Sequence, residues 1–282
     1  MGAVWEWDDS LFLGTAAYYR RGRLPYAPGL AAVLATVLGL DGRGRLIDVG
    51  CGPGTLALSL GPLFREVVGV DPDSGMIAEA TRQAAVCGMG TKARWVRARA
   101  EELPAGLGTF RVASFGQSFH WMDRGLVAAA IRGMLRPGGA LVHISDLKSE
   151  TPSLHGLPHP PAPYAAIEEL VRRYLGPVRR AGRTVLPNGT PGDEAVVLAR
   201  AGFAGPRRYV VPGGQALERT PADLVAWVFS MSYAAPHLFG ERRDAFEADV
   251  RRLLQEVSPS GRFSERQPST EVFVWRKSLA EG

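Results

Sequence analysis

LIDVGCGPGT, residues 46–55, is the stretch of this sequence with the strongest structural signal. A short apolar run leads into three glycines, and a further apolar segment follows them. Glycines let the backbone approach a ligand closely, and the first turn of a helix favours a carboxylate or a phosphate. The pattern predicts a β-strand, a tight glycine loop and a helix, with a ligand held at the loop.

A second acidic position lies at the end of the next predicted strand, in VVGVD, residues 67–71. In nucleotide-binding α/β folds an acid at this place accepts hydrogen bonds from ribose hydroxyls, and we expect the same of Asp71. GPGTLA, residues 52–57, also fits the G-x-G-x-x-A dinucleotide pattern. Together these features predict a site for an adenosine-containing cofactor, without separating the enzyme classes that use one.

Strand and helix patterns alternate between residues 45 and 145, which predicts βαβ units and a parallel sheet. Prolines become frequent after residue 148. We therefore expect four segments along the chain. These are an N-terminal cap segment, 1–29; a cofactor-binding core, 30–148; an insert or lid, 149–202; and the remainder of the core with substrate-side helices and the last strands, 203–282.

The net charge of +5 does not by itself predict nucleic-acid binding, because the 33 basic residues are scattered and include only three lysines. The longest apolar stretch, residues 30–40, is shorter than the ~20 residues that span a bilayer. The two cysteines belong to no CxxC motif or Cys/His cluster. We expect no nucleic-acid partner, no membrane partner, no metal and a cytoplasmic location; the oligomeric state is left open.

Five segments resemble, in order and at family spacing, the motifs of class I S-adenosylmethionine-dependent methyltransferases. They are DVGCGPG (48–54), VGVDPDSGM (68–76), RAEELP (99–104), FGQSFHW (115–121) and LRPGG (135–139). The subgroup that they resemble is type 11, the ubiquinone/menaquinone- and trans-aconitate-methyltransferase-like group. RLPY at 23–26 is similar to the N-terminal segment of that group.

The resemblance implies an α/β fold with a Rossmann-like, doubly wound, mostly parallel seven-stranded sheet, an antiparallel last strand and a partly helical lid. It also implies S-adenosylmethionine as cofactor. Aromatic side chains beside polar groups in the segments outside the core favour a small-molecule acceptor, such as one of specialised metabolism. Alternatives are an RNA or protein methyltransferase, a non-catalytic S-adenosylmethionine-binding protein and a dehydrogenase. GQSF at 116–119 stands where many nucleic-acid amino-methylases have an Asn/Asp-Pro-Pro-Tyr/Phe segment, which weighs against the first alternative.

By the same resemblance, the glycine loop and its neighbours contact the cofactor. Asp48 would accept from the methionine amino group or a bound water, Asp71 would hold the ribose hydroxyls, and Met76 would pack on the adenine. Arg99 replaces the acid that the family places before Ala, so the adenine amino group would be met by Glu101 or a backbone carbonyl. The other predicted cofactor contacts are Gly50, Cys51, Gly52, Gly54, Pro72, Ala100 and Gln117.

His120 is the best placed of the five histidines for proton transfer. It follows the fourth predicted strand, on the edge where doubly wound folds bind ligands. Because histidine takes up a proton near neutral pH, we predict that His120 is the catalytic base for a hydroxyl acceptor. The alternative is a structural hydrogen bond beside Trp121. The predicted substrate-side residues are Tyr19, Arg23, Tyr26 and Trp121.

Overall fold

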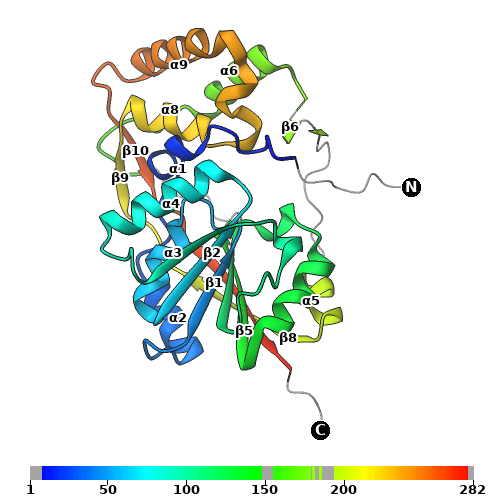
Figure 1. Ribbon diagram of the computed structural model, residues 1–282. Coiled ribbons are helices and arrows are strands. Elements are labelled where there is room, and N and C mark those ends of the chain that lie inside the picture. Colours follow the sequence, from blue (N-terminus) through cyan, green and yellow to red (C-terminus); the bar gives the residue numbers. More distant parts are fainter. Residues whose placement is uncertain (1–7, 148–154, 179, 182–183, 186–193, 279–282) are drawn as a thin grey trace.

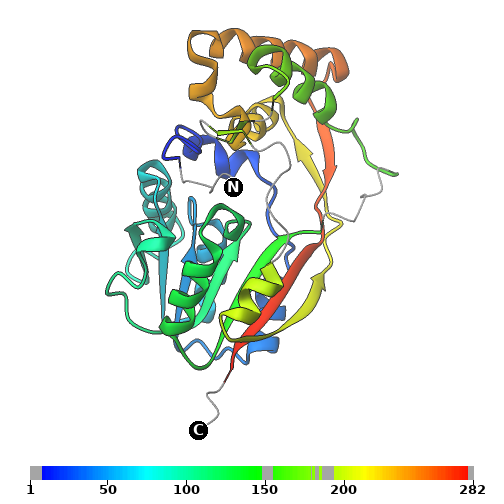
Figure 2. The same ribbon diagram turned by 90° about the vertical axis from the view of Figure 1, so that its right-hand side faces the viewer.

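The computed structural model describes residues 8–147, 155–178, 180–181, 184–185 and 194–278. A sheet with helices on both faces forms one half, and a largely helical lid lies above the carboxyl ends of its central strands (Figures 1 and 2). The C-terminal end of the described chain lies at the end of the sheet that faces away from the lid (Figure 1).

The sheet has seven strands in the order β3-β2-β1-β4-β5-β11-β8. β11 runs antiparallel to both of its neighbours, while the pairs among β1 to β5 are parallel. This confirms the predicted mostly parallel sheet with an antiparallel last strand. The strands are β1 (Arg45–Val49), β2 (Glu66–Asp71), β3 (Ala93–Arg97), β4 (Phe110–Gly116), β5 (Leu135–Asp146), β8 (Phe203–Val211) and β11 (Thr270–Lys277).

Apolar clusters cover both faces of this sheet. Leu46 and Ile47 are neighbours on β1 and point to opposite faces, because side chains alternate along a strand. One cluster joins the sheet to α2 and α3, and the other joins it to α5 and α7. The flanking helices are α2 (Leu30–Leu38), α3 (Thr55–Leu60), α4 (Ser74–Val86), α5 (Arg124–Met134) and α7 (Glu194–Arg200).

The lid has an apolar cluster of its own, in which Phe229, Phe239 and Phe246 pack against one another. It consists of α1 (Ala16–Gly22), α6 (Tyr164–Leu175), α8 (Pro221–Phe229), α9 (Arg243–Val257) and the two-stranded sheet of β9 (Ala216–Arg219) with β10 (Phe263–Arg266). β6 (Arg180–Ala181) and β7 (Thr184–Val185) form a separate short pair. The 3₁₀ turns are Gly61–Leu63, Ala100–Glu102, Phe119–Trp121, Ser232–Ala234 and Pro236–Arg242.

The predicted insert, 149–202, contributes to two layers. Its α6 lies in the lid, whereas α7 packs against α5 and β8 beside the sheet. Residues 149–154 and 186–193 of this segment lie outside the described residues. The segment 203–282 supplies α8, α9, β9 and β10 to the lid as well as two strands to the sheet. The four-part division stays a prediction.

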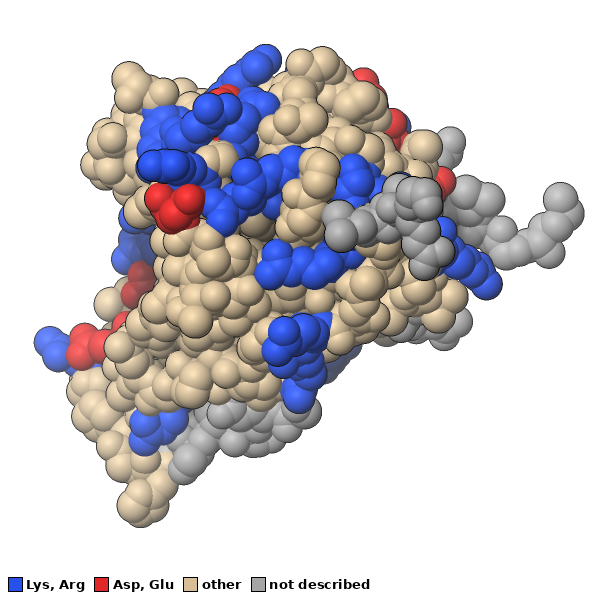
Figure 3. All heavy atoms as spheres, turned by 90° about the horizontal axis from the view of Figure 1, so that it is seen from below, with Lys and Arg blue, Asp and Glu red and all other residues tan. Residues whose placement is uncertain are grey.

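The face at the amino ends of the parallel strands is seen in Figure 3. Lys and Arg side chains form several separate groups on it. One hollow there is lined by Arg45, Arg65, Arg111 and Arg136. Arg45 is paired with Glu66 at 2.8 Å, and Arg111 with Asp41, so acids offset part of this charge. In the parts of the chain that the structure covers, no helix has both the length and the apolar character to cross a membrane.

Candidate functional site

Two adjoining cavities lie between the strand ends and the lid. The first is bounded by residues after β2, β3 and β4, and the second, of about 550 Å³, by the glycine loop, α3, α4 and residues 19–26. The two cavities share part of their lining and therefore lie side by side. The shared residues are Tyr19, Gly50, Gly52, Gly116 and Gln117.

The glycine loop is held on two sides. Gly50 has φ +67°, and a Cβ at this position would lie 2.6 Å from the Cβ of Ser118. Ser118 Oγ donates to the Val49 carbonyl at 2.6 Å, which keeps the segment after β4 against the loop. Gly54, with φ +78°, precedes α3 against the Trp95 ring and does not line either cavity. Glycine at residue 50 thus permits a contact that a side chain would prevent.

Asp71 fixes the other side of the loop. Its carboxylate accepts from the backbone N–H of Gly52 at 2.8 Å and from that of Asp73 at 3.0 Å. Burial raises the pKa of Asp71 to about 6, although both N–H bonds oppose this shift. Each carboxylate oxygen has a second lone pair, so Asp71 can still accept from hydroxyls in the first cavity, which it lines.

Asp48 is almost fully buried and only half satisfied. Ser114 Oγ donates to its Oδ1 at 2.7 Å, whereas the buried Oδ2 has no hydrogen-bond partner among the described residues. Burial raises the pKa of Asp48 to about 7, and the charge of Asp71 adds to this effect. An unsatisfied buried acceptor costs ~1–3 kcal/mol, so this carboxylate at the second cavity is suited to a donor from a ligand.

Arg23 brings a matching unsatisfied donor to the second cavity. Its Nη2 donates to the Ser230 carbonyl at 3.0 Å, and its guanidinium lies 5.0 Å from the centre of the Tyr19 ring. Its Nε is buried and has no acceptor among the described residues. Tyr26 lines the same cavity, and burial, together with nearby Tyr19 and acids, raises its pKa well above the usual value.

The segment that carries Arg23 and Tyr26 is tied to the end of the chain. The N–H of Ala27 donates to Thr270 Oγ1 at 2.8 Å, and Gln267 Nε2 donates to the Tyr26 carbonyl at 2.9 Å. Residues 25–27 are therefore held by the segment that leads into β11. This connection places the N-terminal side of the site over the ends of β4 and β5.

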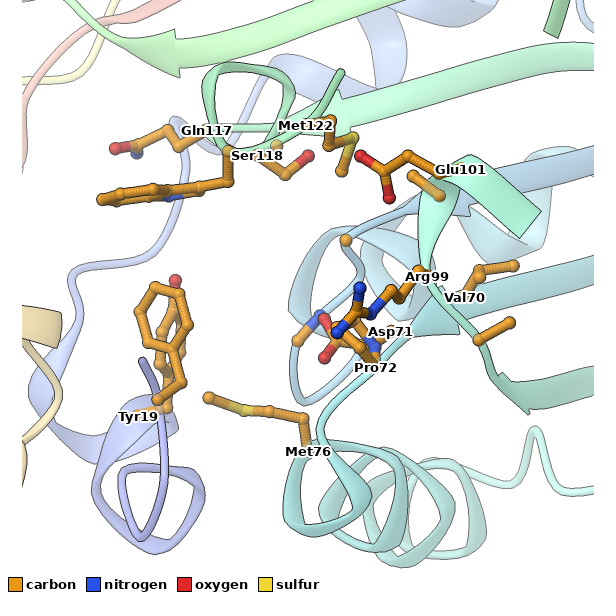
Figure 4. Close-up of a pocket in the computed structure, with 17 residues that line it drawn as sticks. Tyr19, Val70, Asp71, Pro72, Met76, Arg99, Glu101, Gln117, Ser118 and Met122 are labelled. Atoms are coloured by element: carbon orange, nitrogen blue, oxygen red, sulfur yellow. The ribbon is translucent and has the colours of Figure 1, made fainter. Parts of the chain in front are cut away.

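The first cavity has a mixed wall (Figure 4). Met76 points from the start of α4 toward Tyr19 of α1, and Asp71 lies on the same side of the cavity as Arg99. The Asp123 N–H donates to Glu101 Oε1 at 2.8 Å, which fixes the side chain of Glu101. Arg99 extends toward Asp9, 3.4 Å away. The predicted cofactor residues Pro72 and Ala100 line this cavity too, while Cys51 lines the second.

Gln117 stands where the two cavities meet. It has φ +54°, which is uncommon for a residue other than glycine and costs of order 1–3 kcal/mol. Its N–H donates to the Ile144 carbonyl at 3.0 Å, and its Nε2 donates to Asp146 Oδ2 at 3.2 Å. These bonds hold the strained conformation and connect the ends of β4 and β5.

His120 does not share the position of its neighbour Trp121. Trp121 lines the first cavity, whereas His120 is not among the lining residues of either cavity. The two rings are 4.7 Å apart between centroids, and His120 contributes to the electrostatic environment of Glu194 at the start of α7. His143 lies 2.9 Å from the same carboxylate. The role of His120 as a base stays a prediction.

Asp146 is one of the site residues that the sequence analysis missed. It ends β5, lines the second cavity and is bonded to Gln117. The signal was present, because polar residues at the carboxyl ends of parallel strands tend to face the ligand. Within the described ranges, no group of three or more His, Cys, Asp or Glu residues is arranged to hold a metal ion.

Comparisons with known proteins find similar methyltransferases. The methyltransferase domain family matches residues 46–139. An uncharacterized methyltransferase of Mycobacterium tuberculosis is 28% identical over 229 residues, which cover 80% of this chain and 79% of the relative. A probable S-adenosylmethionine-dependent methyltransferase of Saccharomyces cerevisiae is 28% identical over 102 residues, 34% of each chain.

Solved structures share the fold. A putative sarcosine dimethylglycine methyltransferase from Galdieria sulphuraria superposes with a TM-score of 0.51 at 14% identity and covers 96% of this chain and 99% of its own. A putative methyltransferase from Bacillus halodurans has a TM-score of 0.50 at 15% identity, with 88% and 99% covered. At these identities the likeness concerns the fold alone.

The strand order, the glycine loop and the family match define a class I S-adenosylmethionine-dependent methyltransferase. Within that class, the motifs of the chain resemble those of the type 11 group. The chain is an enzyme, and S-adenosylmethionine is its cofactor. The predicted fold, class and cofactor are thereby confirmed.

Proposed function

We propose that this enzyme methylates a small-molecule acceptor bound in the second cavity. The observation that carries the proposal is a cavity of about 550 Å³ under α1, which adjoins the glycine loop and would hold the acceptor together with the amino-acid end of the cofactor. Sites for small molecules typically enclose ~300–1,000 Å³. An RNA or a folded protein would need an open approach to these strand ends, over which the lid lies (Figure 2).

The unsatisfied atoms of the site fit the amino-acid end of the cofactor. Asp48 Oδ2 lacks a donor and would accept from the cofactor's amino group, and Arg23 Nε lacks an acceptor and would donate to its carboxylate. Asp71 would hold the ribose hydroxyls. When bound, S-adenosylmethionine supplies a methyl group activated on a sulfonium. The proposed adenine contacts are Pro72, Met76, Ala100 and Glu101.

The remaining work of the protein is positioning. A methyl group on a sulfonium is already activated, so holding an acceptor in line with it can supply several kcal/mol of the barrier. Tyr19 and Tyr26 would enclose the acceptor, and Gln117 would border both ligands. Water would be excluded by the same residues. His120 remains the sequence-based candidate for taking up the acceptor's proton.

Calorimetric titration followed by a substrate comparison tests this proposal. We expect S-adenosylhomocysteine to bind and NAD not to bind, since a dehydrogenase would require the second. S-adenosylhomocysteine formation should then be measured with three pools as acceptors: small molecules, RNA and protein. Turnover with the small-molecule pool supports the proposal. Turnover confined to the RNA or protein pool, or binding without any turnover, would contradict it.

A further inference from the structure

We infer that Asp146 takes up the proton released by the acceptor, and that the acceptor therefore carries a hydroxyl or an amine. The inference rests on the proposed function and deepens it by assigning a residue and a class of acceptor group. Four observations support it: the order of polar residues along the strand ends, the position of Asp146, the charges of the cavity, and the placement of His120.

Polar groups follow one another along four neighbouring strands. Asp71 ends β2, Asp48 lies near the end of β1, Gln117 follows β4, and Asp146 ends β5. Adjacent strands are ~4.8 Å apart, so β5 lies roughly 10 Å beyond β1, on the side away from β2. The proposed cofactor contacts of Asp71 and Asp48 use the ends of β2 and β1. The ends of β4 and β5 are left to border the acceptor.

Asp146 is held in place at this edge. β11 pairs with β5 beside it, with Thr270 opposite Asp146, and the Leu147 N–H donates to the Ser269 carbonyl at 2.9 Å. Gln117 Nε2 donates to Asp146 Oδ2 at 3.2 Å. A carboxylate offers about four acceptor positions, so Asp146 can accept from several donors at once, and it lines the second cavity.

The charges that line the second cavity indicate the class of acceptor. They include two acids, Asp48 and Asp146, and two arginines, Arg20 and Arg23. The proposed cofactor contacts use Asp48 and Arg23, which leaves Asp146 beside the acceptor. A carboxylate acceptor at this point would be repelled by Asp146, whereas an O–H or N–H group would donate to it. Tyr26 cannot replace Asp146, because the raised pKa of its phenol keeps the proton in place.

The transfer then balances in atoms and charge. The lone pair of the acceptor oxygen or nitrogen forms a bond to the methyl carbon. The methyl–sulfur bond breaks, and its electron pair stays on sulfur, which becomes a neutral thioether. The proton of the acceptor passes to the Asp146 carboxylate and later to solvent. One positive and one negative charge are thus neutralised together, and no further reactant is needed.

His120 is less well placed for this role than Asp146. It follows the same strand as Gln117 but lies in the 3₁₀ turn Phe119–Trp121 and does not line either cavity. Its ring lies 4.7 Å from that of Trp121, and it acts electrostatically on Glu194 of α7. A base has to lie within hydrogen-bond reach of the proton that it abstracts. The geometry therefore favours Asp146.

Sinefungin tests the assignment without knowledge of the acceptor. This cofactor analogue carries an amine-bearing carbon in place of the methyl-bearing sulfur, so its ammonium probes the position of the transferred methyl. The dissociation constants of sinefungin and S-adenosylhomocysteine should be measured by calorimetry for the wild type and for Asp146→Asn. The matched control is Asp71→Asn, which is expected to weaken both ligands by the same factor.

We expect the wild type to bind sinefungin about tenfold or more tightly than S-adenosylhomocysteine, as a charge-assisted hydrogen bond would produce. Asp146→Asn should remove most of this preference and leave S-adenosylhomocysteine binding within about twofold. Asp71→Asn should keep the preference. An unchanged preference in a folded Asp146→Asn variant would overturn the inference. Failure of S-adenosylhomocysteine to bind the wild type would instead overturn the cofactor contacts of the proposed function.

Discussion

Two halves of the site are assembled in different ways: the cofactor half, which comprises the glycine loop with the ends of β1 and β2, and the lid half, which comprises residues 19–26 and the lid above them. In the first, the contacts that hold Asp71 come from within two residues or from the preceding glycine loop. In the lid, Arg219 of β9 donates to the Gly22 carbonyl of α1 at 2.8 Å and pairs with Glu265 of β10 at 3.1 Å. Tyr164 of α6 donates to the same Glu265. One half is built from near neighbours in the chain, and the other from segments far apart.

This difference separates what is common to the class from what is particular to this enzyme. The cofactor is shared by the class, and the residues proposed to hold it lie mostly on one strand–loop–helix unit and the strands beside it. The acceptor is particular, and its proposed pocket is completed by residues 19–26 under the lid. If the two halves are energetically distinct, substitutions in the cofactor half should change cofactor affinity, and substitutions in the lid half should change the free energy of unfolding alone.

The largest effect is expected at Asp48. The pKa of Asp48 is about 7 in the folded protein, whereas an aspartate of the unfolded chain has a pKa of about 3.9. The folded state therefore holds the proton more tightly. The stabilisation by this proton is complete below about pH 4 and is lost as the pH rises through 7. The free energy of unfolding therefore falls by at most about 1.4 kcal/mol per pH unit, and by roughly 4 kcal/mol over the whole range.

Asp48→Asn removes this slope. Denaturant unfolding between about pH 5 and 8 should show that the variant gains stability relative to the wild type as the pH rises. S-adenosylhomocysteine binding should weaken in the variant, because the proposed acceptor for the amino group loses its charge. Unfolding curves that change with pH in parallel for both proteins would show that Asp48 is not the titrating group.

The next largest effect tests the contribution of Asp71 to cofactor affinity. Asp71→Ala should weaken S-adenosylhomocysteine binding by roughly 1–3 kcal/mol, since ribose hydroxyls would lose their acceptor in a closed site. Calorimetry gives the dissociation constant directly. The variant also removes the bond to the Gly52 N–H, so circular dichroism should accompany the titration as a control on the fold. Unchanged affinity would remove Asp71 from the cofactor site.

A substitution in the lid should lower the free energy of unfolding and leave the affinity for the cofactor unchanged. Tyr164→Phe removes a hydrogen bond to the largely buried Glu265 and should lower the free energy of unfolding by about 1–2 kcal/mol. Tyr174→Phe is the matched control, because its bond to Asp249 lies near the surface and should contribute less than about 0.5 kcal/mol. An altered dissociation constant of S-adenosylhomocysteine in Tyr164→Phe would break the distinction between the halves.

The smallest effect is expected at His120. His120→Ala should leave S-adenosylhomocysteine affinity within about twofold and, once an acceptor is known, turnover within about tenfold. A fall in turnover of ~10²-fold or more with intact affinity is the signature of a positioned base. That result would restore the sequence-based assignment and count against Asp146.

The cofactor half was predictable from sequence because its determinants are local. The glycine loop and the acid at the end of β2 each depend on a few consecutive residues, and each occurs as expected. In contrast, α1 is seven residues long and carries no apolar periodicity that could predict it. The pairing of β9 with β10 joins residues 216–219 to residues 263–266, a separation that patterns in short windows cannot detect.

The candidate base shows the same limit on a finer scale. His120 follows one central strand and Asp146 ends another, so position in the sequence favours neither. A 3₁₀ turn after β4 sends Trp121 and not His120 into the first cavity. The direction of a side chain after a strand depends on the turn that follows, and the sequence patterns predict the strand far better than this turn.

The hydrogen bonds that join Thr270 and Gln267 to residues 26–27 have a consequence for synthesis of the chain. On the ribosome, residues 19–26 emerge first, but the partners that fix them emerge about 240 residues later, ~10–50 s afterwards at ordinary elongation rates. The strands β1 to β5 can pair before that time, so a nascent chain can form most of the sheet early. The acceptor pocket has to wait for the last strand, and a chain truncated before residue 267 should lack it.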